Sequence, residues 1–570
     1  MEKWVVYAKR ADFQGIGKKY GIDPVIARLI RNRDVEGEKE IYTYLYGKLE
    51  ELPSPWLLKD MDKAVAILLH KITEKKKIRI IGDYDIDGVT ATCILLKGMQ
   101  YLGANVDTYI PDRVKDGYGL HEQLVQKAVE DKVDTIVTCD NGIAAAAEIE
   151  YAKREGITVV VTDHHDIPFR ETEYGREWII PKADAVINPK QTDCPYPNKN
   201  LCGAVVAWKV IGALYEKMNV PKEEILKFTE LAAIATVGDV MDLQGENRII
   251  VKEGLKKLSK TTFPGLRALI QVNDLEGAEI TAYHVGFVLG PCINASGRLD
   301  TAARSLALLC AEDWNEAAKL AGDLLALNQS RKAMTEEGKA EAVKMIETSG
   351  VESDRVLVVY LPECHESLAG IIAGRIRELY HKPTFVLTKA ADGVKGSGRS
   401  IESYSMYEEL VKCSDLLTQF GGHPMAAGLS LKEENVELFR RRLNTNCTLT
   451  KEDLMPKIMI DVPMPISYIS RSLVEQLKIL EPFGKGNTKP LFAQKNVRVM
   501  GLRILGRSRN VAKMKLQDPS GVQMDAVYFG EADEFASFAE QRDTISVTYY
   551  PEINSYQGRE TLQVVIRNYC

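Results

Sequence analysis

The chain has 570 residues, of which 45% are hydrophobic and 27% charged, so it is long enough for several globular domains. It contains no apolar run of about 18 residues, and no apolar stretch follows its basic start, so we expect no membrane association and a cytoplasmic location. Its ten cysteines show no CxxC spacing, which favours free thiols over disulfides or cysteine-bound zinc. The net charge of −6 excludes a protein that coats nucleic acid through overall charge alone.

Strand-like and helix-like segments alternate in the first part of the chain. Buried strands are expected over residues 77–82, 133–139 and 157–162, with helices over 90–101, 144–154 and 228–237. This alternation is typical of a parallel sheet, in which ligands bind beyond the carboxyl ends of the strands. The segment 312–348 lacks proline and has leucines at near-helical spacing, so it is expected to form one long helix.

The second half restarts with a strand over 355–360 and an α/β pattern, then turns from residue 457 to short alternating strands typical of a small barrel. The predicted fold is α/β and multidomain. Four parts are expected: a parallel-sheet domain with an N-terminal extension, a connecting helix, a second α/β domain, and a C-terminal β-barrel of the OB type, over residues 1–311, 312–350, 351–450 and 451–570.

Ionisable residues gather directly after the predicted strands: Asp83, Asp85 and Asp87, then Asp140, then Asp163, His164 and His165. Asp239 follows the helix predicted over 228–237. Burying so many charges is costly unless a partner or a metal neutralises them. A strand-end turn or a core histidine would explain one such motif alone. Asp83, Asp85, Asp87 and Gly88 also fit positions one, three, five and six of an EF-hand calcium loop. That alternative fails because the twelfth position, which requires a bidentate Glu, is Ile94.

Carboxylates suit Mg²⁺ or Mn²⁺, and added imidazole shifts the preference toward Mn²⁺. Four clusters at corresponding positions of one sheet fit a site for two divalent metal ions, Mn²⁺ preferred or Mg²⁺. Such a site activates water and stabilises charge on a phosphoryl centre. The residues therefore predict hydrolysis of a phosphate ester or anhydride.

The motifs GDYDIDG, TCDNG, TDHHD and TVGD, from Gly82, Thr138, Thr162 and Thr236, resemble those of the DHH phosphoesterase superfamily. The resemblance implies that the metal ligands are Asp85, Asp87, Asp140, His164 and Asp239, with Asp140 bridging both ions. It implies catalytic support or substrate contact for Asp163 and His165. Many members have histidine where this chain has Asp83, so Asp83, grouped with the catalytic residues, is either a ligand or a supporting residue.

Further motifs lie far from the acidic clusters. They are GPCINASGRLDTA, NQSRK, HESLAGIIAGRI, GSGRS, GGHPMAAG and LEPFGKGNTKPLF, from Gly290, Asn328, His365, Gly396, Gly421 and Leu480. They resemble the RecJ family of single-strand-specific 5′ to 3′ exonucleases, with its DHHA1 domain and OB-fold. The resemblance covers nearly the whole chain.

A terminal phosphate could be bound by residues of these motifs. Glycines such as Gly421 and Gly422 let a backbone approach phosphate closely, and Arg399 with Ser397 offers charge-assisted hydrogen bonds. A phosphate fixed at a set distance from the metals would make cleavage start at a strand end. Taken singly, each glycine motif is typical of a tight turn and each arginine of a surface ion pair. The complete predicted substrate set is Arg113, Arg298, His365, Ser397, Arg399, Gly421, Gly422 and His423.

The predicted function is a two-metal exonuclease that hydrolyses single-stranded DNA from the 5′ end to mononucleotides in repair and recombination. The expected partners are single-stranded DNA with a 5′ end, a single-strand-binding protein and a helicase, and the expected state is a monomer. One alternative is a DHH phosphodiesterase for cyclic dinucleotides or short RNA, against which the OB-like segment counts. Another is a non-catalytic DNA-binding scaffold, for which loss of the metal carboxylates would be expected.

Overall fold

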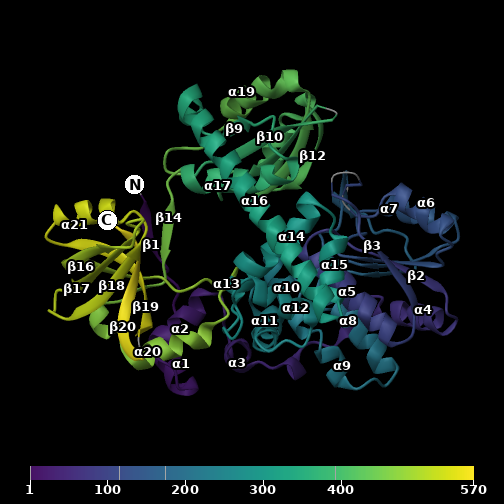
Figure 1. Ribbon diagram of the computed structural model, residues 1–570, viewed down its shortest axis with the longest axis horizontal. Coiled ribbons are helices and arrows are strands. Elements are labelled where there is room, and N and C mark those ends of the chain that lie inside the picture. The colour runs from purple at the N-terminus through teal and green to yellow at the C-terminus, as the bar shows by residue number, and fades with distance from the viewer. Residues whose placement is uncertain (1, 114–115, 118, 174, 392, 557) are drawn as a thin grey trace. The chain divides into compact units, whose positions relative to one another are not determined.

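The computed structural model describes residues 2–570 apart from 114–115, 118, 174, 392 and 557 (Figure 1). The chain forms two compact units. The first contains residues 53–241 and 253–456, and the second contains 2–52, 242–252 and 457–570. None of the described helices has the length and hydropathy of a membrane span.

The first unit is built on a five-stranded parallel sheet, as the sequence predicted. Its strand order is β3 (Asn105–Tyr109), β2 (Lys77–Ile81), β4 (Thr135–Cys139), β5 (Thr158–Thr162) and β8 (Ala185–Ile187). After β3 the chain returns past β2 to form β4, so the strand order reverses between β2 and β4. That reversal is where ligands bind in open α/β sheets. The motifs that follow β2 and β4 therefore meet at one edge.

Helices bury the apolar strands of this sheet. One apolar cluster joins the sheet to α6 (Glu122–Glu130) and α7 (Ala146–Arg154). The helix α5 (Ile86–Tyr101) packs against α8 (Gly203–Lys217) and α10 (Thr229–Gly238). The other helices of this part are α4 (Met61–Thr73), α9 (Lys222–Leu226), α12 (Pro264–Val272), α13 (Ala282–His284), α14 (Gly290–Leu299) and α15 (Ala303–Cys310), and an exposed hairpin consists of β6 (Phe169–Thr172) and β7 (Gly175–Trp178).

The long helix predicted over 312–348 is present as α16 (Trp314–Ser349). Asp313 caps its start by accepting a hydrogen bond from Glu316 N, and Gly350 ends it with a left-handed φ of 75°. A mixed sheet follows, in the order β12 (Leu417–His423), β13 (Ala426–Leu431), β11 (Gly393–Arg399), β10 (Thr384–Ala390) and β9 (Leu357–Tyr360), with α17 (Ala369–Tyr380), α18 (Met406–Val411) and α19 (Val436–Asn446). In this sheet Ser397 pairs with Gly428, and Gly428 pairs with Gly421.

The second unit contains the predicted C-terminal barrel, which closes because β19 pairs with β16. The strand order is β16 (Phe492–Leu505), β17 (Val511–Gln517), β18 (Gln523–Phe529), β20 (Arg559–Tyr569) and β19 (Ile545–Tyr556), and β19 then pairs with β16 again. The short strand β15 (Val462–Pro463) adds to β16, and α20 (Arg471–Leu477) and α21 (Ala532–Glu540) complete this part.

The N-terminal segment belongs to this second unit, whereas the sequence assigned it to the first domain as an extension. Its strand β1 (Lys3–Val6) pairs in parallel with β14 (Lys457–Ile460). The apolar faces of α1 (Phe13–Tyr20), α2 (Pro24–Asn32) and α3 (Glu38–Tyr46) join the core of the barrel. Pairing between segments as far apart in sequence as β1 and β14 leaves no local pattern, so the sequence could not reveal it. The sequence-based domain boundaries stay a prediction.

Arg248 connects the three segments of the second unit. It lies in α11 (Gly245–Leu258) and is 1% exposed. Its guanidinium lies 3.9 Å from the centroid of the Tyr44 ring and donates hydrogen bonds to the backbone oxygens of Tyr44, Ile479 and Leu480. A buried charge that is stacked and hydrogen-bonded in this way holds residues from all three segments together.

Candidate metal centre

The first acidic motif is held in place by two helix starts. Asp85 caps α5 and accepts hydrogen bonds from the amides of Asp87 (2.9 Å) and Gly88 (3.1 Å). The Asp87 carboxylate accepts hydrogen bonds from Gly203 N (2.6 Å) and Ala204 N (2.8 Å), in the first turn of α8. Helix N-termini stabilise negative charge. Both carboxylates are therefore fixed before any ligand binds.

The second and third motifs follow β4 and β5. Asp140 has a left-handed φ of 61° and is 2% exposed. Asp163 lies beneath the histidine pair: its Oδ2 accepts from Ile143 N (2.9 Å), and its Oδ1 accepts from the amides of His164 (2.7 Å) and His165 (3.1 Å). The same Oδ1 lies 2.8 Å from Nδ1 of His165. These bonds use both oxygens of Asp163, which therefore positions the two histidines.

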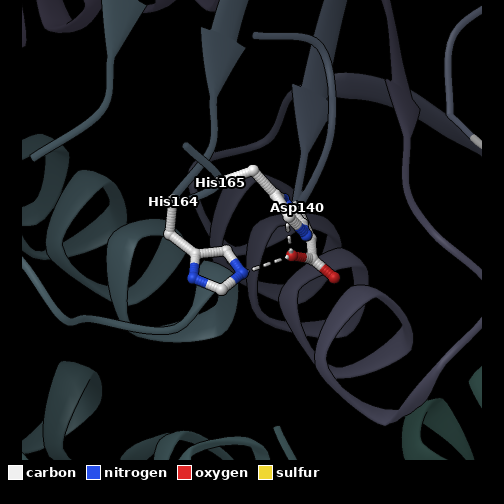
Figure 2. A group of neighbouring side chains, drawn as sticks. All are labelled: Asp140, His164 and His165. Carbon is white, nitrogen blue, oxygen red and sulfur yellow. Dashed lines mark ion pairs between the residues drawn. The ribbon is translucent and has the colours of Figure 1, made fainter. Parts of the chain in front are cut away.

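The predicted ligands converge around His164. Its Nε2 lies 3.0 Å from Asp140, 3.6 Å from Asp87 and 3.7 Å from Asp239, the residue that caps the end of α10. Figure 2 shows His164 and His165 beside the Asp140 carboxylate, and His165 Nδ1 lies 3.8 Å from it. Ligand atoms within 4.8 Å of one another form three groups: Asp87, His164 and Asp239; Asp83, Asp85 and Asp140; and Asp140, His164 and His165.

Burial and mutual repulsion make these carboxylates hard to ionise. Burial and the charge of Asp85 raise the pKa of Asp83 well above its usual value, and burial with the charges of Asp87, Asp85 and Asp83 does the same for Asp140. Burial and Asp87 also raise the pKa of Asp85 and bring that of Asp239 to about 8. A bound cation would reverse this preference by neutralising the repulsion.

The two histidines differ in their environments. Burial lowers the pKa of His164, which favours the neutral imidazole that binds metals. Burial opposes charge on His165 as well, but the hydrogen bond and charge of Asp163 outweigh it and raise its pKa to about 9. For Asp163, burial would raise the pKa, yet its bond to His165 leaves it lowered.

The donor set suits divalent cations. Within the described part of the chain, Asp83 Oδ1 and His164 Nδ1 are buried without a hydrogen-bond partner, and His164 Nε2 faces the carboxylates of Asp140, Asp87 and Asp239. Buried polar atoms are normally paired, so an acidic and imidazole cluster with such unpaired atoms is suited to a bound cation. Oxygen donors with imidazole match Mg²⁺ and Mn²⁺. The geometry also places Asp83 at ligand distance from Asp85 and Asp140, a placement that the sequence left open.

A cavity of about 420 Å³ begins next to this centre, within the first unit. From the metal-binding domain it is lined by Tyr84, which lies between Asp83 and Asp85, and by Arg113. From the mixed sheet it is lined by residues that include Lys395, Ser397, Gly421, Gly428 and Ser430. The cavity therefore brings together Arg113, Ser397 and Gly421 from the predicted substrate set.

Arg113 lines this cavity, and two further predicted arginines, Arg298 and Arg399, lie within range of its charge. Arg113 lies over the Tyr84 ring, with its guanidinium carbon 4.9 Å from the centroid. Burial and then the charge of Arg113 lower the pKa of Arg298 to about 10 and also lower that of Arg399. Arg298 donates to Ser367 O at 2.9 Å, and Arg399 donates to Gly398 O at 2.8 Å. At Arg298 the charge of Asp85 offsets this lowering of the pKa only in part, and the remaining excess of positive charge suits an anion.

The remaining predicted residues are placed less directly. His365 Nδ1 lies 2.7 Å from Ser367 Oγ, so His365 orders the residue whose carbonyl binds Arg298. Gly422 has a φ of 144° and, like His423, is exposed and outside the cavity lining. The charge of His423 reaches Asp166 of the TDHHD motif.

Sequence reasoning did not single out two cavity residues. Tyr84 is the central aromatic residue of GDYDIDG, so its position inside the motif was the available signal. Lys395 precedes GSGRS and forms an ion pair with Glu366 at 2.9 Å. Only the packing of the two domains showed that Lys395 and Tyr84 line one space.

Comparison with family models divides the chain into three known domains. Residues 77–236 match the DHH family, N-terminal domain; residues 353–448 match the DHHA1 domain; and residues 460–568 match the RecJ OB domain. Single-stranded-DNA-specific exonuclease RecJ of Bacillus subtilis is 35% identical over 99% of this chain and 70% of that protein. Its Escherichia coli counterpart is 34% identical over 96% of both chains.

Solved structures agree with these relatives. RecJ from Thermus thermophilus in complex with Mn²⁺ superposes with a TM-score of 0.82, at 28% identity, over 100% of this chain and 79% of that chain. Its complex with Mg²⁺ gives a TM-score of 0.78. Given relatives of this similarity along almost its entire length, the chain belongs to the RecJ family of single-stranded-DNA-specific exonucleases.

Proposed function

We propose that the chain is a Mn²⁺- or Mg²⁺-dependent exonuclease that hydrolyses single-stranded DNA from its 5′ end and releases mononucleotides. One observation carries the proposal: Tyr84 lies between two metal-site aspartates and also lines the cavity that contains Arg113 and Ser397. A phosphate bound in that cavity lies a short, fixed distance from the metal centre. Fixing the strand end at one distance from the reacting atoms makes cleavage start at the end.

The ligand roles follow the two acidic groups. Asp87, His164 and Asp239 would hold one cation and Asp83 and Asp85 the other, and Asp140, which groups with Asp83 and Asp85 and lies 3.0 Å from His164, would contribute to both. When bound, two divalent cations lower the pKa of the attacking water and neutralise charge on the phosphate. The helix starts that hold Asp85 and Asp87 keep these carboxylates oriented throughout.

Asp163 and His165 support this centre from one side. Asp163 fixes the His165 ring through its Nδ1, and the ring lies 4.5 Å, between centroids, from that of His164. His165 is 43% exposed, whereas His164 is 7% exposed. His165 can therefore reach the substrate phosphate while His164 remains a ligand.

The 5′ phosphate is assigned to the arginines of the cavity. Arg113 supplies charge and Ser397 a hydroxyl at the cavity wall, while Arg298 and Arg399 add positive charge from outside the lining. Gly421 and Gly428 pair with each other, so at this position β12 and β13 carry no side chain and their backbone can approach an anion closely. His365 holds the Ser367 segment whose carbonyl accepts from Arg298, while Gly422 and His423 lie at the end of β12, outside the cavity lining.

The proposal is tested with Mn²⁺ and labelled oligonucleotides, single- and double-stranded, with and without a 5′ phosphate, beside a cyclic dinucleotide. We expect mononucleotides from the 5′ end of single strands only. Asp140→Ala should abolish cleavage, whereas Asp193→Asn, at an exposed ion pair with Lys59, should not. Hydrolysis of the cyclic dinucleotide alone, or DNA binding without cleavage that Asp140→Ala leaves unchanged, would contradict the proposal.

We further propose that the enzyme acts as a cytoplasmic monomer in repair and recombination, on strands opened by a helicase and covered by single-strand-binding protein. The monomer is supported by the location of the metal centre and the cavity within one compact unit of one chain. Analytical ultracentrifugation of the active enzyme at assay concentration tests it, and activity confined to a dimer fraction would exclude it.

A further inference from the structure

Two aromatic side chains are exposed near the metal centre and stack on each other. Tyr283 is 64% and Phe287 63% exposed, the highest values among the large hydrophobic residues that the structure describes. Their ring centroids are 5.0 Å apart with an interplanar angle of 27°. Tyr283 lies in α13, and Phe287 lies in a π-helical turn, Val285–Leu289, which continues into α14. Such turns occur frequently at functional sites.

This helical segment runs along the metal centre. At its start Gly286 faces Val237 of α10, two residues before Asp239: a Cβ at position 286 would lie 3.8 Å from Val237 Cγ1. Further along, the Asn294 side chain accepts a hydrogen bond from Ile86 N (2.8 Å), inside the GDYDIDG motif. At its end Arg298 donates to Ser367 O beside the cavity. The labels α13 and α14 in Figure 1 mark the two parts of this segment.

Tyr283, Phe287, Asn294 and Arg298 follow one another at intervals of four, seven and four residues, which places them along one side of the helix. This is the side on which Asn294 meets the metal loop and Arg298 meets Ser367, in the short helix Glu366–Leu368 that precedes α17. Eleven residues separate Phe287 from Arg298, or roughly 16 Å at 1.5 Å per residue. The aromatic pair is therefore separated from the proposed site for the terminal phosphate by more than one nucleotide.

We propose that Tyr283 and Phe287 form a base-stacking platform for the strand on the 3′ side of the scissile phosphate. This inference rests on the proposed function, because it takes the 5′ end to be bound near Arg298. Aromatic rings stack on any base, at about 1 to 3 kcal/mol per base. The paired bases of a duplex are already stacked on one another and offer no free face. The platform therefore favours single strands without reading their sequence.

The first test measures KM with Mn²⁺ for a 5′-phosphorylated dT dinucleotide and for a 20-residue dT strand. Tyr283→Ala/Phe287→Ala is expected to raise KM for the long strand roughly 5- to 150-fold, the equivalent of one stacked base. The increase should be confined to strands long enough to reach the pair. The matched control is Tyr101→Ala, at another exposed tyrosine (55%), and it should leave both KM values unchanged.

Single substitutions at Phe287 separate stacking from general apolar contact. Phe287→Trp should retain the wild-type KM for the long strand, whereas Phe287→Leu, which keeps apolar bulk without a ring, should raise it. With Asp140→Asn present to prevent cleavage, 2-aminopurine placed at successive positions should be quenched most at one downstream position, and Phe287→Leu should remove that quenching. Circular dichroism verifies the fold of each variant.

Two results would overturn the platform: a KM for the long strand that the double variant leaves unchanged, or equal behaviour of Phe287→Leu and Phe287→Trp. The second would assign the pair to apolar contact with protein. Failure of the proposed function itself would look different, because wild-type enzyme would then cleave neither the dinucleotide nor the long strand from the 5′ end.

Discussion

Gly203 touches two metal-site aspartates at once. Its amide donates to Asp87 Oδ2 at 2.6 Å, and a Cβ at its position would lie 2.7 Å from the Cβ of Asp140. Only a residue without a side chain permits this approach, because real Cβ atoms essentially never come within 3.0 Å of a non-bonded heavy atom. The start of α8 is thereby fitted closely against both acidic motifs.

Gly203→Ala is therefore expected to displace Asp140 or the start of α8 and to lower both Mn²⁺ affinity and exonuclease activity at least tenfold. The control is Gly212→Ala in the same helix, where the nearest atom to a new Cβ, Ile225 Cγ1, is 3.6 Å away. That substitution should leave activity intact and, by helix propensity, stabilise slightly. Isothermal titration with Mn²⁺ and an exonuclease assay measure both. Equal effects at the two glycines would contradict the close fit.

Asp163→Asn should reduce activity roughly 10- to 100-fold, the usual cost of losing a partner that orients metal ligands. Asp163 Oδ1 accepts three hydrogen bonds, from the amides of His164 and His165 and from His165 Nδ1. The substitution either puts an NH₂ group in its place or leaves an uncharged oxygen, which is a weaker acceptor. Metal titration and kcat measurements separate loss of ligand geometry from loss of the His165 contact. Wild-type kcat and Mn²⁺ affinity in Asp163→Asn would show that the bonds have no role in catalysis.

Without metal, Asp140 is a source of instability, because burial and four neighbouring aspartates disfavour its charge. Asp140→Asn should therefore raise Tm in EDTA at pH 8 while reducing the rise in Tm that Mn²⁺ produces. For the wild type, a free Mn²⁺ concentration 100 times Kd adds about 2.7 kcal/mol of stability. Differential scanning calorimetry with and without Mn²⁺ measures both changes. A lower Tm for Asp140→Asn in EDTA would refute the like-charge explanation.

The burial of Glu230 predicts a pH dependence of stability that does not involve the proposed metal ligands. It lies in α10, is 4% exposed, and burial raises its pKa to about 7, with Thr261 and Lys257 offsetting part of the effect. Because the folded-state pKa is raised, its contribution to stability is complete below pH 4.5 and is lost as pH rises through 7. The loss reaches roughly 3 kcal/mol above pH 7.

Glu230→Gln removes this titration, so its free energy of unfolding relative to wild type should rise between pH 5 and pH 8. Chemical denaturation at the two pH values measures the change. Glu223→Gln, at an exposed residue of α9, should show no such trend. A difference between Glu230→Gln and wild type that does not vary with pH would be inconsistent with a raised pKa.

Arg248→Met should destabilise the second unit by about 3 kcal/mol or more, because it leaves two buried carbonyl oxygens and one partly buried one without their donor. Lys256→Met, at an exposed residue of α11, serves as the control. Limited proteolysis should cut the barrel unit of Arg248→Met first. Equal thermal stability of the two variants would exclude the proposed connecting role of Arg248.

The sequence by itself determined the parallel sheet, the long helix, the barrel and the positions of the acidic motifs. These follow from local patterns: β-branched runs that end on Asp83, Asp140 and Asp163 must place those residues at one edge of a parallel sheet. Divalent-metal chemistry follows from the ligand types alone. The motif resemblance then narrowed the predicted substrate from any phosphoester to the 5′ end of a DNA strand.

Only the tertiary structure decided which of those residues contact one another. Asp83 lies beside Asp85 and Asp140, and both carboxylate oxygens of Asp163 form hydrogen bonds, to Ile143 N and to His165. These contacts depend on how loops from different strands pack together. The N-terminal segment joins the barrel through contacts between residues far apart in sequence. Tyr283 and Phe287 remain exposed because no distant part of the described chain covers them. Local periodicity fixes which face of an element is apolar, but the partner that buries it, or leaves it open, is set by long-range packing.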